Sequence, residues 1–355
     1  MMFSKRMQNL TPYIPGEQPQ DRTYIKLNTN ENPYPPSPRL KAFLNEFTCD
    51  ALRLYPDPLS NDLRKQIADK YGVCQDQTFV GNGSDEVLAF AFYAFFDSSD
   101  GNLLFPRFSY SFYPVYCDFF GIRYHKINLN SDFSIDVCRF TDAGESCGII
   151  FPNPNAPTGI LLSLDQIVKL LDNYPSDRVV IIDEAYIDFG GESAVGLIDT
   201  YSNLLIVRTF SKSMSLAGVR LGFAMGAAPL ISALFSVKDS FNSYPVNMLT
   251  QKIGAIALAD DAWMQSTTTK IIAGREILTF ELQKSGWNVL PSGANFIMAG
   301  KNGFSGKEIY LQLKDKGILV RYFDIDGLKN FVRITIGTND ELKSLINEIR
   351  KCFGN

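Results

Sequence analysis

Between roughly residues 60 and 240, short apolar runs alternate with stretches of helical periodicity. The runs are rich in β-branched and aromatic residues, which is typical of strands that are buried on both faces. Strands of this kind, joined by helical crossovers, form a mostly parallel sheet with helices on both faces, so the pattern predicts an α/β fold. The expected strands are residues 78–80, 102–105, 148–151, 179–182 and 204–207.

Two apolar stretches beside these runs need their own interpretation. Residues 85–96 are almost wholly apolar after their first turn, which indicates a helix buried in the fold rather than a surface helix. Residues 221–237 lack charge and approach the length of a membrane span, but Gly222, Gly226 and Pro229 interrupt them. We therefore expect a strand, a turn and the start of a helix there, and no membrane partner.

The pattern changes after about residue 270, where strands mix with helices in a smaller α+β arrangement. A helix is expected at residues 339–352, because its apolar residues fall on one stripe. Residues 12–38 are rich in Pro and Asn and indicate an extended arm. The strands expected in the C-terminal part lie near residues 295–298, 318–322 and 331–335.

The length of 355 residues favours two domains that share a cleft. We predict an N-terminal arm that joins the small domain, a large domain and a small C-terminal domain. These parts are expected to cover residues 1–45, 46–250 and 251–355, with the boundary in a helical connection near residues 240–270.

Composition argues against several classes of function. Lys and Arg number 34 against 38 Asp and Glu, so the net charge of −4 offers no basic field for nucleic acid. No apolar stretch follows the charged start, so we expect no signal peptide and a cytoplasmic protein. The six cysteines show no metal-ligand spacing and are expected to be reduced thiols. The only histidine, His125, cannot by itself build a His-rich metal site or a Ser-His-Asp triad. No metal is expected.

Polar side chains follow two of the expected strands, at the ends where open α/β sheets bind ligands. Asp183 comes directly after the run 179–182, and Tyr186 follows three residues later. A carboxylate at a buried sheet edge requires a cation, and a protonated pyridine nitrogen would satisfy it. On the residues alone, Asp183 is equally well explained as a cap of the next segment, and Tyr186 as a packing residue.

Lys212 follows the run 204–207 and stands between two serines. Eight residues later Arg220 adds a guanidinium fork suited to phosphate, between Gly218 and Gly222, which let backbone approach closely. With the acid and the phenol above, these groups fit a phosphorylated aldehyde cofactor, and Lys212 is the amine that bonds to its aldehyde.

The segment Gly81-Asn-Gly-Ser-Asp85 leads from a strand into the apolar helix. Free N–H groups and the positive end of a helix dipole attract anions, although in isolation a plain capped turn is the stronger interpretation. After another strand, residues 153–159 offer side-chain amides to a ligand or form a tight surface turn. Tyr110 can stack on a flat cofactor, but a core position is the default for any one aromatic residue. Tyr55 stands on a Pro-rich loop.

Two arginines near the C-terminus are candidates for binding anions. Arg333 alternates with apolar neighbours and so points from a half-buried strand, where it requires a structural carboxylate or one from a substrate. Arg321 is a second candidate for an anionic group of a substrate.

These motifs together resemble the pyridoxal-phosphate-dependent aminotransferases of fold type I, most closely their histidinol-phosphate branch. The resemblance extends essentially from end to end. The segments Thr209-Phe-Ser-Lys212 and Leu216-Ala-Gly-Val-Arg220 are specific for the superfamily. The segments Leu27-Asn-Thr-Asn-Glu-Asn-Pro-Tyr34 and Leu54-Tyr-Pro-Asp-Pro58 point to the histidinol-phosphate branch.

The resemblance implies pyridoxal 5'-phosphate as cofactor and assigns roles around its ring. Lys212 would bond to the cofactor and then move a proton, and Asp183 would pair with the ring nitrogen. Tyr186 and an Asn of the loop 153–159 would contact the ring hydroxyl. Many relatives have Asn directly before Pro-Thr-Gly where this chain has Ala156, so Asn155 is the nearest substitute.

The same resemblance assigns the phosphate of the cofactor to the N–H groups of Ser84 and Asp85 together with Ser211 and Arg220. Tyr110 would stack on the ring.

Further roles implied by the resemblance concern the partner subunit and the substrates. Tyr55 would reach the cofactor phosphate from a second subunit, which makes a homodimer necessary for a complete site. Arg333 would hold the carboxylate of glutamate or 2-oxoglutarate, and Arg321 with Tyr13 the phosphate of histidinol phosphate. The implied reaction transfers an amino group between L-histidinol phosphate and 2-oxoglutarate, giving imidazole-acetol phosphate and L-glutamate, in histidine biosynthesis.

Other functions stay open at this point. An aromatic amino acid aminotransferase is an alternative, since one such site can accept an imidazole or a phenyl ring. A pyridoxal-phosphate decarboxylase of a phosphorylated amino acid is a second alternative, and a non-catalytic regulator that keeps the cofactor fold is a third.

Overall fold

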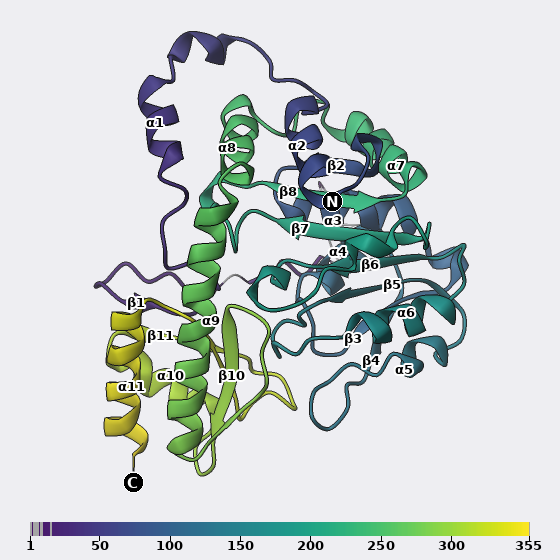
Figure 1. Cartoon of the computed structure of the whole chain (residues 1–355). Coiled ribbons are helices and arrows are strands. Elements are labelled where there is room, and N and C mark those ends of the chain that lie inside the picture. Colours follow the sequence, from purple (N-terminus) through teal and green to yellow (C-terminus); the bar gives the residue numbers. More distant parts are fainter. Residues whose placement is uncertain (1, 3–6, 8–9, 15, 355) are drawn as a thin grey trace.

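The main sheet of the protein has seven strands in the order β2-β8-β7-β6-β5-β3-β4 (Figure 1). It is seen in a computed structural model that describes residues 2, 7, 10–14 and 16–354. Strand β8 is antiparallel to both of its neighbours, and the other pairs are parallel. The predicted mostly parallel α/β fold is confirmed. The strands are β2 (Thr78–Gly81), β3 (Asn102–Pro106), β4 (Tyr124–Ile127), β5 (Ser146–Pro152), β6 (Val179–Asp183), β7 (Leu204–Thr209) and β8 (Gly222–Gly226).

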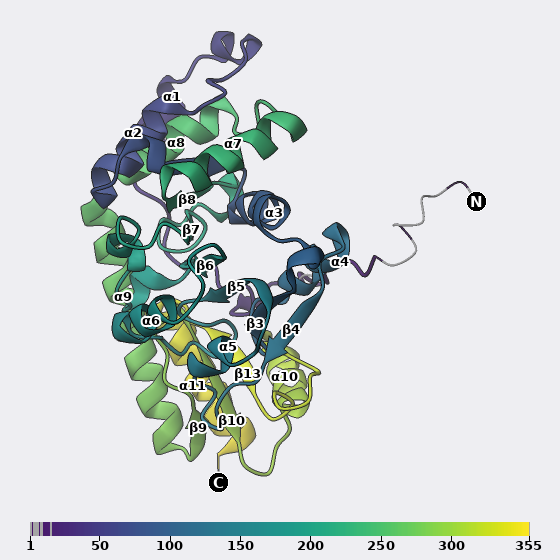
Figure 2. The same ribbon diagram turned by 90° about the vertical axis from the view of Figure 1, so that its right-hand side faces the viewer.

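Helices cover both faces of this sheet, with α3 and α4 on one side and α6 on the other (Figure 2). Successive residues of β6 alternate between two cores, because Val180 and Ile182 pack on one face and Ile181 on the other. This explains why the strands appear in the sequence as continuous apolar runs. The helices of this part are α1 (Arg39–Glu46), α2 (Asn61–Tyr71), α3 (Ser84–Phe95), α4 (Tyr113–Phe120), α5 (Cys138–Thr141), α6 (Leu164–Asp172), α7 (Ala228–Phe241) and α8 (Met248–Leu258).

Both apolar stretches have the predicted structure. Residues 85–96 correspond to α3, whose Val87, Leu88 and Phe92 are fully buried. Residues 221–237 form β8 and the first part of α7. Within the described part of the chain, no helix combines the length and the apolar character needed to cross a membrane.

A second, four-stranded antiparallel sheet has the order β12-β13-β10-β9. The long helix α9 (Asp261–Lys284) runs from the region of α8 to this sheet (Figure 1). Helix α11 buries Leu342, Leu345 and Ile349, as its stripe predicts, and begins at a capping box between Thr338 and Glu341. The other elements are β9 (Trp287–Val289), β10 (Phe296–Lys301), α10 (Gly306–Asp315), β11 (Ile318–Leu319), β12 (Arg321–Tyr322), β13 (Val332–Thr335) and α11 (Asn339–Phe353).

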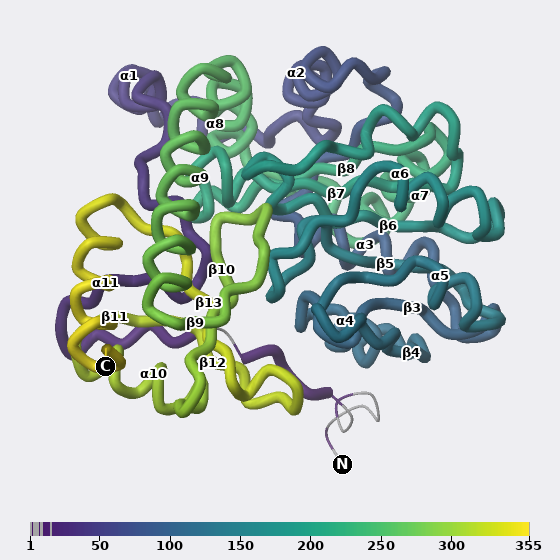
Figure 3. Tube along the Cα trace, turned by 60° about the horizontal axis from the view of Figure 1, so that its bottom comes forward, coloured from purple at the N-terminus to yellow at the C-terminus, as the bar shows by residue number. Residues whose placement is uncertain are grey.

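The N-terminal arm lies along this second part (Figure 3). Strand β1 (Ile25–Lys26) pairs in parallel with β11, and the Thr335 amide donates to the Leu27 carbonyl at 2.9 Å. Leu27 is buried in the core of the smaller sheet. We propose that this core and the two cores of the large sheet mark the small and large domains, with the arm belonging to the small one. Part of the predicted arm lies outside the described residues.

Candidate functional site

Apart from Tyr55, the cofactor residues predicted from the sequence lie at one edge of the large sheet. Strands β5, β6 and β7 are parallel neighbours, so their carboxyl ends lie together, and the loops that follow carry Tyr186 and Lys212. A cavity of about 230 Å³ opens at this edge. Loops of the large sheet, the arm and the smaller sheet all contribute to its wall. The predicted residues that line it are Tyr13, Tyr110, Tyr186, Lys212, Arg321 and Arg333.

Lys212 presents its amine to this cavity. Its Nζ lies 5.6 Å from the centre of the Tyr186 ring and 3.4 Å from the Thr29 carbonyl oxygen, to which it donates. The arm fixes both residues: Asn30 Nδ2 donates to the Tyr186 hydroxyl at 3.0 Å, and Asn32 Nδ2 donates to the Lys212 carbonyl at 3.0 Å. The amine is therefore held at the cavity while its backbone is tied to the arm.

Asp183 is a buried carboxylate that the protein leaves without a cation. Its oxygens accept hydrogen bonds from the Tyr113 hydroxyl at 3.1 Å and from the Ala185 amide at 3.1 Å. Among the described residues, no Lys or Arg forms an ion pair with it. Burial raises the pKa of Asp183 to about 6. A protonated ring nitrogen would supply the missing positive charge.

The residues expected to hold a phosphate converge at the start of α3. Arg220 Nη2 lies 3.0 Å from Asp85 Oδ2, and Arg220 Nη1 lies 3.5 Å from Ser211 Oγ. Arg220 adopts the left-handed backbone conformation (φ 57°), which a non-glycine residue adopts at an energetic cost. The first N–H groups of a helix have no partner inside it, so the N–H groups of Ser84 and Asp85 can donate hydrogen bonds to an anion here.

Close backbone approach occurs at one of the two predicted glycines. A Cβ atom on Gly222 would lie 2.2 Å from the Ser84 amide nitrogen, so only glycine lets β8 approach the start of α3. A Cβ atom on Gly218 would have no described atom within 4 Å, so close approach of a bound phosphate to this glycine stays a prediction.

Tyr110 connects the cavity to this phosphate-binding region. Its hydroxyl donates to Asp85 Oδ1 at 2.9 Å, and burial raises its pKa well above the ordinary value. Its ring lines the cavity, where a flat ligand can stack on it.

Asn155 is fully buried, and its side-chain amide donates to the Phe108 carbonyl and to Thr158 Oγ1. Its Oδ1 is buried and accepts no hydrogen bond within the described part of the chain. Asn155 is not on the cavity wall, which is formed at this point by Ala156 and Pro157. Its contact with a ring hydroxyl stays a prediction.

Two arginines face the cavity from the smaller sheet. Arg333 donates from Nη2 to the Asn28 carbonyl at 3.0 Å, while its buried Nε has no hydrogen-bond partner among the described residues. No carboxylate of the described residues pairs with Arg333, and burial lowers its pKa. Arg321 lies over the Phe323 ring at 5.6 Å, and Tyr13 packs on Phe112 with ring centres 5.0 Å apart. An anionic ligand would fit beside the two guanidinium groups.

The comparison with known proteins decides the family. A family model described as aminotransferase class I and II matches residues 22–349. The chain belongs to this family. It is 59% identical to a histidinol-phosphate aminotransferase of Syntrophus aciditrophicus over 99% of this chain and 98% of the relative. It is 49% identical to a histidinol-phosphate aminotransferase of Chromohalobacter salexigens over 98% of this chain and 97% of the relative.

Solved structures agree with this aminotransferase fold. The histidinol-phosphate aminotransferase of Sinorhizobium meliloti in complex with pyridoxal-5'-phosphate matches with a TM-score of 0.88 at 22% identity, covering 99% of this chain and 98% of that one. A double mutant of Thermus thermophilus aspartate aminotransferase matches with a TM-score of 0.85 at 20% identity, covering 99% of each chain. These two structures show the fold.

The aminotransferase family implies pyridoxal 5'-phosphate as cofactor, and the residues around the cavity fit this group. Asp183 lacks a cation, Lys212 offers an amine, and the start of α3 with Arg220 offers an anion site. Among the described residues, no cluster of three or more His, Cys, Asp or Glu could hold a metal ion.

Tyr55 does not join the cavity of its own chain. Its side chain is 81% exposed and stacks on Tyr244 with ring centres 4.7 Å apart, beside a different surface pocket between α2 and α8.

Three side-chain contacts of the site were not predicted from the sequence. Asn30 and Asn32 hold Tyr186 and Lys212, and Tyr113 donates to Asp183. The cluster of asparagines in the arm was a usable signal for the first two, since side-chain amides on an extended segment find their partners in the elements it packs against. Nothing in the sequence separates Tyr113 from the other tyrosines.

Proposed function

We propose that this chain is a histidinol-phosphate aminotransferase of histidine biosynthesis, which transfers an amino group between L-histidinol phosphate and 2-oxoglutarate. The observation that carries this proposal is that Lys212, Arg321 and Arg333 line the same cavity. Two guanidinium groups suit two anionic substrates, because histidinol phosphate carries a phosphate and 2-oxoglutarate carries two carboxylates. Relatives of this name, 48–59% identical over nearly the whole chain, support it.

Each residue of the cofactor site has one task in this proposal. Pyridoxal 5'-phosphate, when bound, withdraws electrons from the carbon that loses its amino group. Asp183 keeps the proton on the ring nitrogen, because its buried carboxylate is stabilised by that positive charge. The Nζ of Lys212 would take a proton from the reacting carbon of the substrate and return it to C4′, the former aldehyde carbon of the cofactor. Tyr186, held by Asn30, orients the ring hydroxyl.

The substrates would be bound by side chains that line the cavity outside the cofactor site. Arg333 would hold the carboxylate of glutamate or 2-oxoglutarate, which also satisfies its unpartnered Nε. Arg321 and Tyr13 would contact the phosphate of histidinol phosphate. Since both substrates use one cavity, they enter in turn, and the reaction proceeds in two half-reactions.

Lys212→Ala tests the proposal. Formation of glutamate from histidinol phosphate should fall at least about thousandfold, because the variant loses both the cofactor bond and the proton carrier. The visible absorbance of the bound cofactor should change as well. Lys65→Ala, at an exposed position, is the control and should keep full activity. Release of carbon dioxide without any need for 2-oxoglutarate, or higher activity with phenylalanine than with histidinol phosphate, would contradict the proposed reaction.

We also propose a homodimer in which Tyr55 reaches the cofactor phosphate of the partner subunit. Two observations support this: Tyr55 is 81% exposed, and it lines a different pocket from the cavity of its own chain. Tyr55→Ala and Lys212→Ala chains should each be impaired alone. Mixed after dissociation, they should recover activity, because one site of each hybrid dimer then carries both residues. No recovery would contradict shared sites.

We place the enzyme in the cytoplasm. Its cysteines are all free thiols, and Cys117 and Cys147 are buried as such, which suits a reducing compartment.

A further inference from the structure

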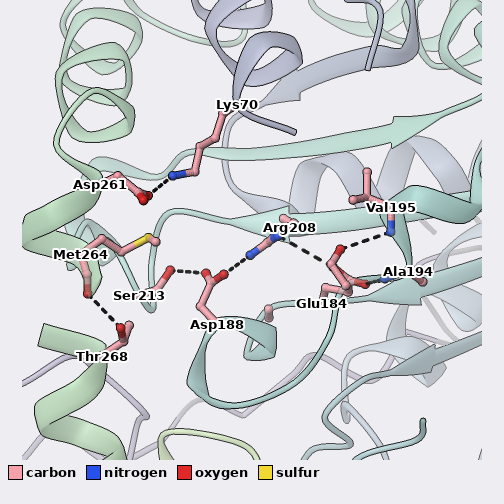
Figure 4. Close-up of polar contacts among 12 residues, drawn as sticks. Lys70, Glu184, Asp188, Ala194, Val195, Arg208, Ser213, Asp261, Met264 and Thr268 are labelled. Atoms are coloured by element: carbon pink, nitrogen blue, oxygen red, sulfur yellow. Dashed lines mark hydrogen bonds and ion pairs between the residues drawn. The ribbon is translucent and has the colours of Figure 1, made fainter. Parts of the chain in front are cut away.

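A buried cluster of charges lies between the two loops that carry the cofactor residues, and the proposed mechanism does not use it (Figure 4). Its centre is Arg208 on β7, whose side chain is 5% exposed. Arg208 forms an ion pair with Asp188 and lies 3.9 Å from Glu184 Oε2. Its guanidinium also lies over the Tyr71 ring at 4.8 Å. The cation is thus held on several sides.

The Glu184 side of the cluster is attached to the main chain of the sheet. Glu184 accepts hydrogen bonds from Ser193 Oγ at 2.6 Å and from the Ala194 amide at 2.7 Å. Its own amide donates to the Val207 carbonyl at 2.8 Å. Glu184 therefore fixes the guanidinium of Arg208 relative to the loop that begins at Asp183.

The Asp188 side of the cluster leads to the catalytic lysine. One oxygen of Asp188 binds Arg208, and the other accepts the Ser213 hydroxyl at 2.5 Å. Ser213 is 2% exposed and directly follows Lys212. From the arm, Asn32 Nδ2 donates to the carbonyls of Lys212 and Ser213 at 3.0 and 3.3 Å.

We propose that Arg208, Asp188 and Ser213 are positioning residues, which hold the backbone of Lys212 so that its amine meets the cofactor aldehyde. Lysine has a flexible four-carbon stem, so its amine is only as well placed as the backbone that carries it. Hydrogen bonds to buried ionised groups are short and strong, and a fully satisfied network is rigid. This inference rests on the proposed use of pyridoxal 5'-phosphate.

The alternative is that the cluster only stabilises the fold. The binding of two forms of the cofactor distinguishes this structural role from the positioning role. Pyridoxal 5'-phosphate has the aldehyde to which Lys212 bonds. Pyridoxamine 5'-phosphate has the same ring and phosphate but no aldehyde, so its binding does not depend on the position of the amine. The dissociation constants of both are measured by titration of the full chain after its cofactor is removed.

Ser213→Ala removes the link between Asp188 and the lysine loop and leaves the ion pair intact. We expect it to weaken the binding of pyridoxal 5'-phosphate about tenfold, as for the loss of one hydrogen bond to a charged group, and that of pyridoxamine 5'-phosphate less than about twofold. Ser37→Ala is the matched control. It also removes a buried hydroxyl that donates to a carboxylate, that of Asp260 at 2.6 Å, but among the described residues its hydroxyl bonds only to Asp260 and the Arg39 amide, which are not part of the site. It should leave both constants unchanged.

Asp188→Asn is a second test variant. It should weaken the binding of pyridoxal 5'-phosphate relative to that of pyridoxamine 5'-phosphate by the same factor as Ser213→Ala. The double variant should lose no more selectivity than either single one, because both changes interrupt one chain of contacts. Equal weakening of both cofactor forms, or no weakening of either, overturns the positioning role. A wild-type chain that does not bind pyridoxal 5'-phosphate overturns the proposed function itself, and the inference with it.

Discussion

Asp183 and Asp188 lie five residues apart and are both largely buried, but the protein treats their charges in opposite ways. Asp188 has Arg208 and Ser213 as partners. Burial alone would raise the pKa of Asp188, but the Arg208 charge and the hydrogen bonds outweigh it, and the pKa is lowered. Asp183 accepts hydrogen bonds from Tyr113 and Ala185 but pairs with no cation of the residues that the structure describes, and burial raises its pKa to about 6.

The same contrast separates Arg208 and Arg333. Burial lowers the pKa of both groups, but in Arg208 the charges of Asp188 and Glu184 reverse the effect and its pKa is raised. The pKa of Arg333 stays lowered, and no described residue forms a hydrogen bond with its Nε. A charge that is paired within the chain serves the fold, whereas a buried charge left without its counterpart marks the place of a ligand.

The largest effect should come from removing the cation of the paired region. Arg208→Met leaves Asp188 and Glu184 buried without a counter-charge, and the free energy of unfolding should fall by about 3 to 5 kcal/mol. The measurement is urea unfolding at pH 7 on cofactor-free protein. The matched comparison is Arg333→Met, which removes a buried guanidinium that has no carboxylate and should leave the stability equal or higher. An equal loss of unfolding free energy in the two variants would contradict the distinction between paired and unpaired buried charges.

A somewhat smaller effect should appear in the pH dependence of Asp183. Its pKa is raised in the folded state, so the folded protein binds this proton more tightly than the unfolded chain does, and stability is lost as the pH rises from about 4 to 7. Cofactor-free Asp183→Asn should lack this loss and exceed the wild type by about 3 kcal/mol at pH 7, but not at pH 4.

Asp188→Asn is the control for this pH dependence, and its sign is opposite. Because the pKa of Asp188 is lowered, its contribution to stability is present at pH 7 and is lost as the pH falls through the folded-state pKa. The variant should therefore be less stable than the wild type at pH 7, and the difference should shrink in acid. A wild type that gains stability on the alkaline side relative to Asp183→Asn would contradict the assignment of Asp183.

The strands of the sheet could be predicted well from the sequence, but the side-chain contacts of the site less well, for a physical reason. Strands such as β6 and β7 are buried on both faces, so they appear as continuous apolar runs, and polar residues at their ends are easily found. Contacts such as Asn30 with Tyr186 join residues 156 positions apart, and no local pattern encodes them. Ala156, rather than Asn155, forms the cavity wall because that depends on how the loop turns after β5.

The smallest of these effects concerns catalysis rather than stability. Arg333→Met should lower kcat/KM for 2-oxoglutarate roughly hundredfold, because the substrate carboxylate loses the buried cation that it pairs with. Arg321→Met should act more on histidinol phosphate than on 2-oxoglutarate, which makes it the matched control within the same cavity. Steady-state rates with each substrate varied in turn separate the two arginines. If Arg333→Met instead lowers kcat/KM for both substrates equally and also lowers the unfolding free energy, Arg333 belongs with Arg208 among the residues that serve the fold, and the unpaired charge no longer marks a ligand.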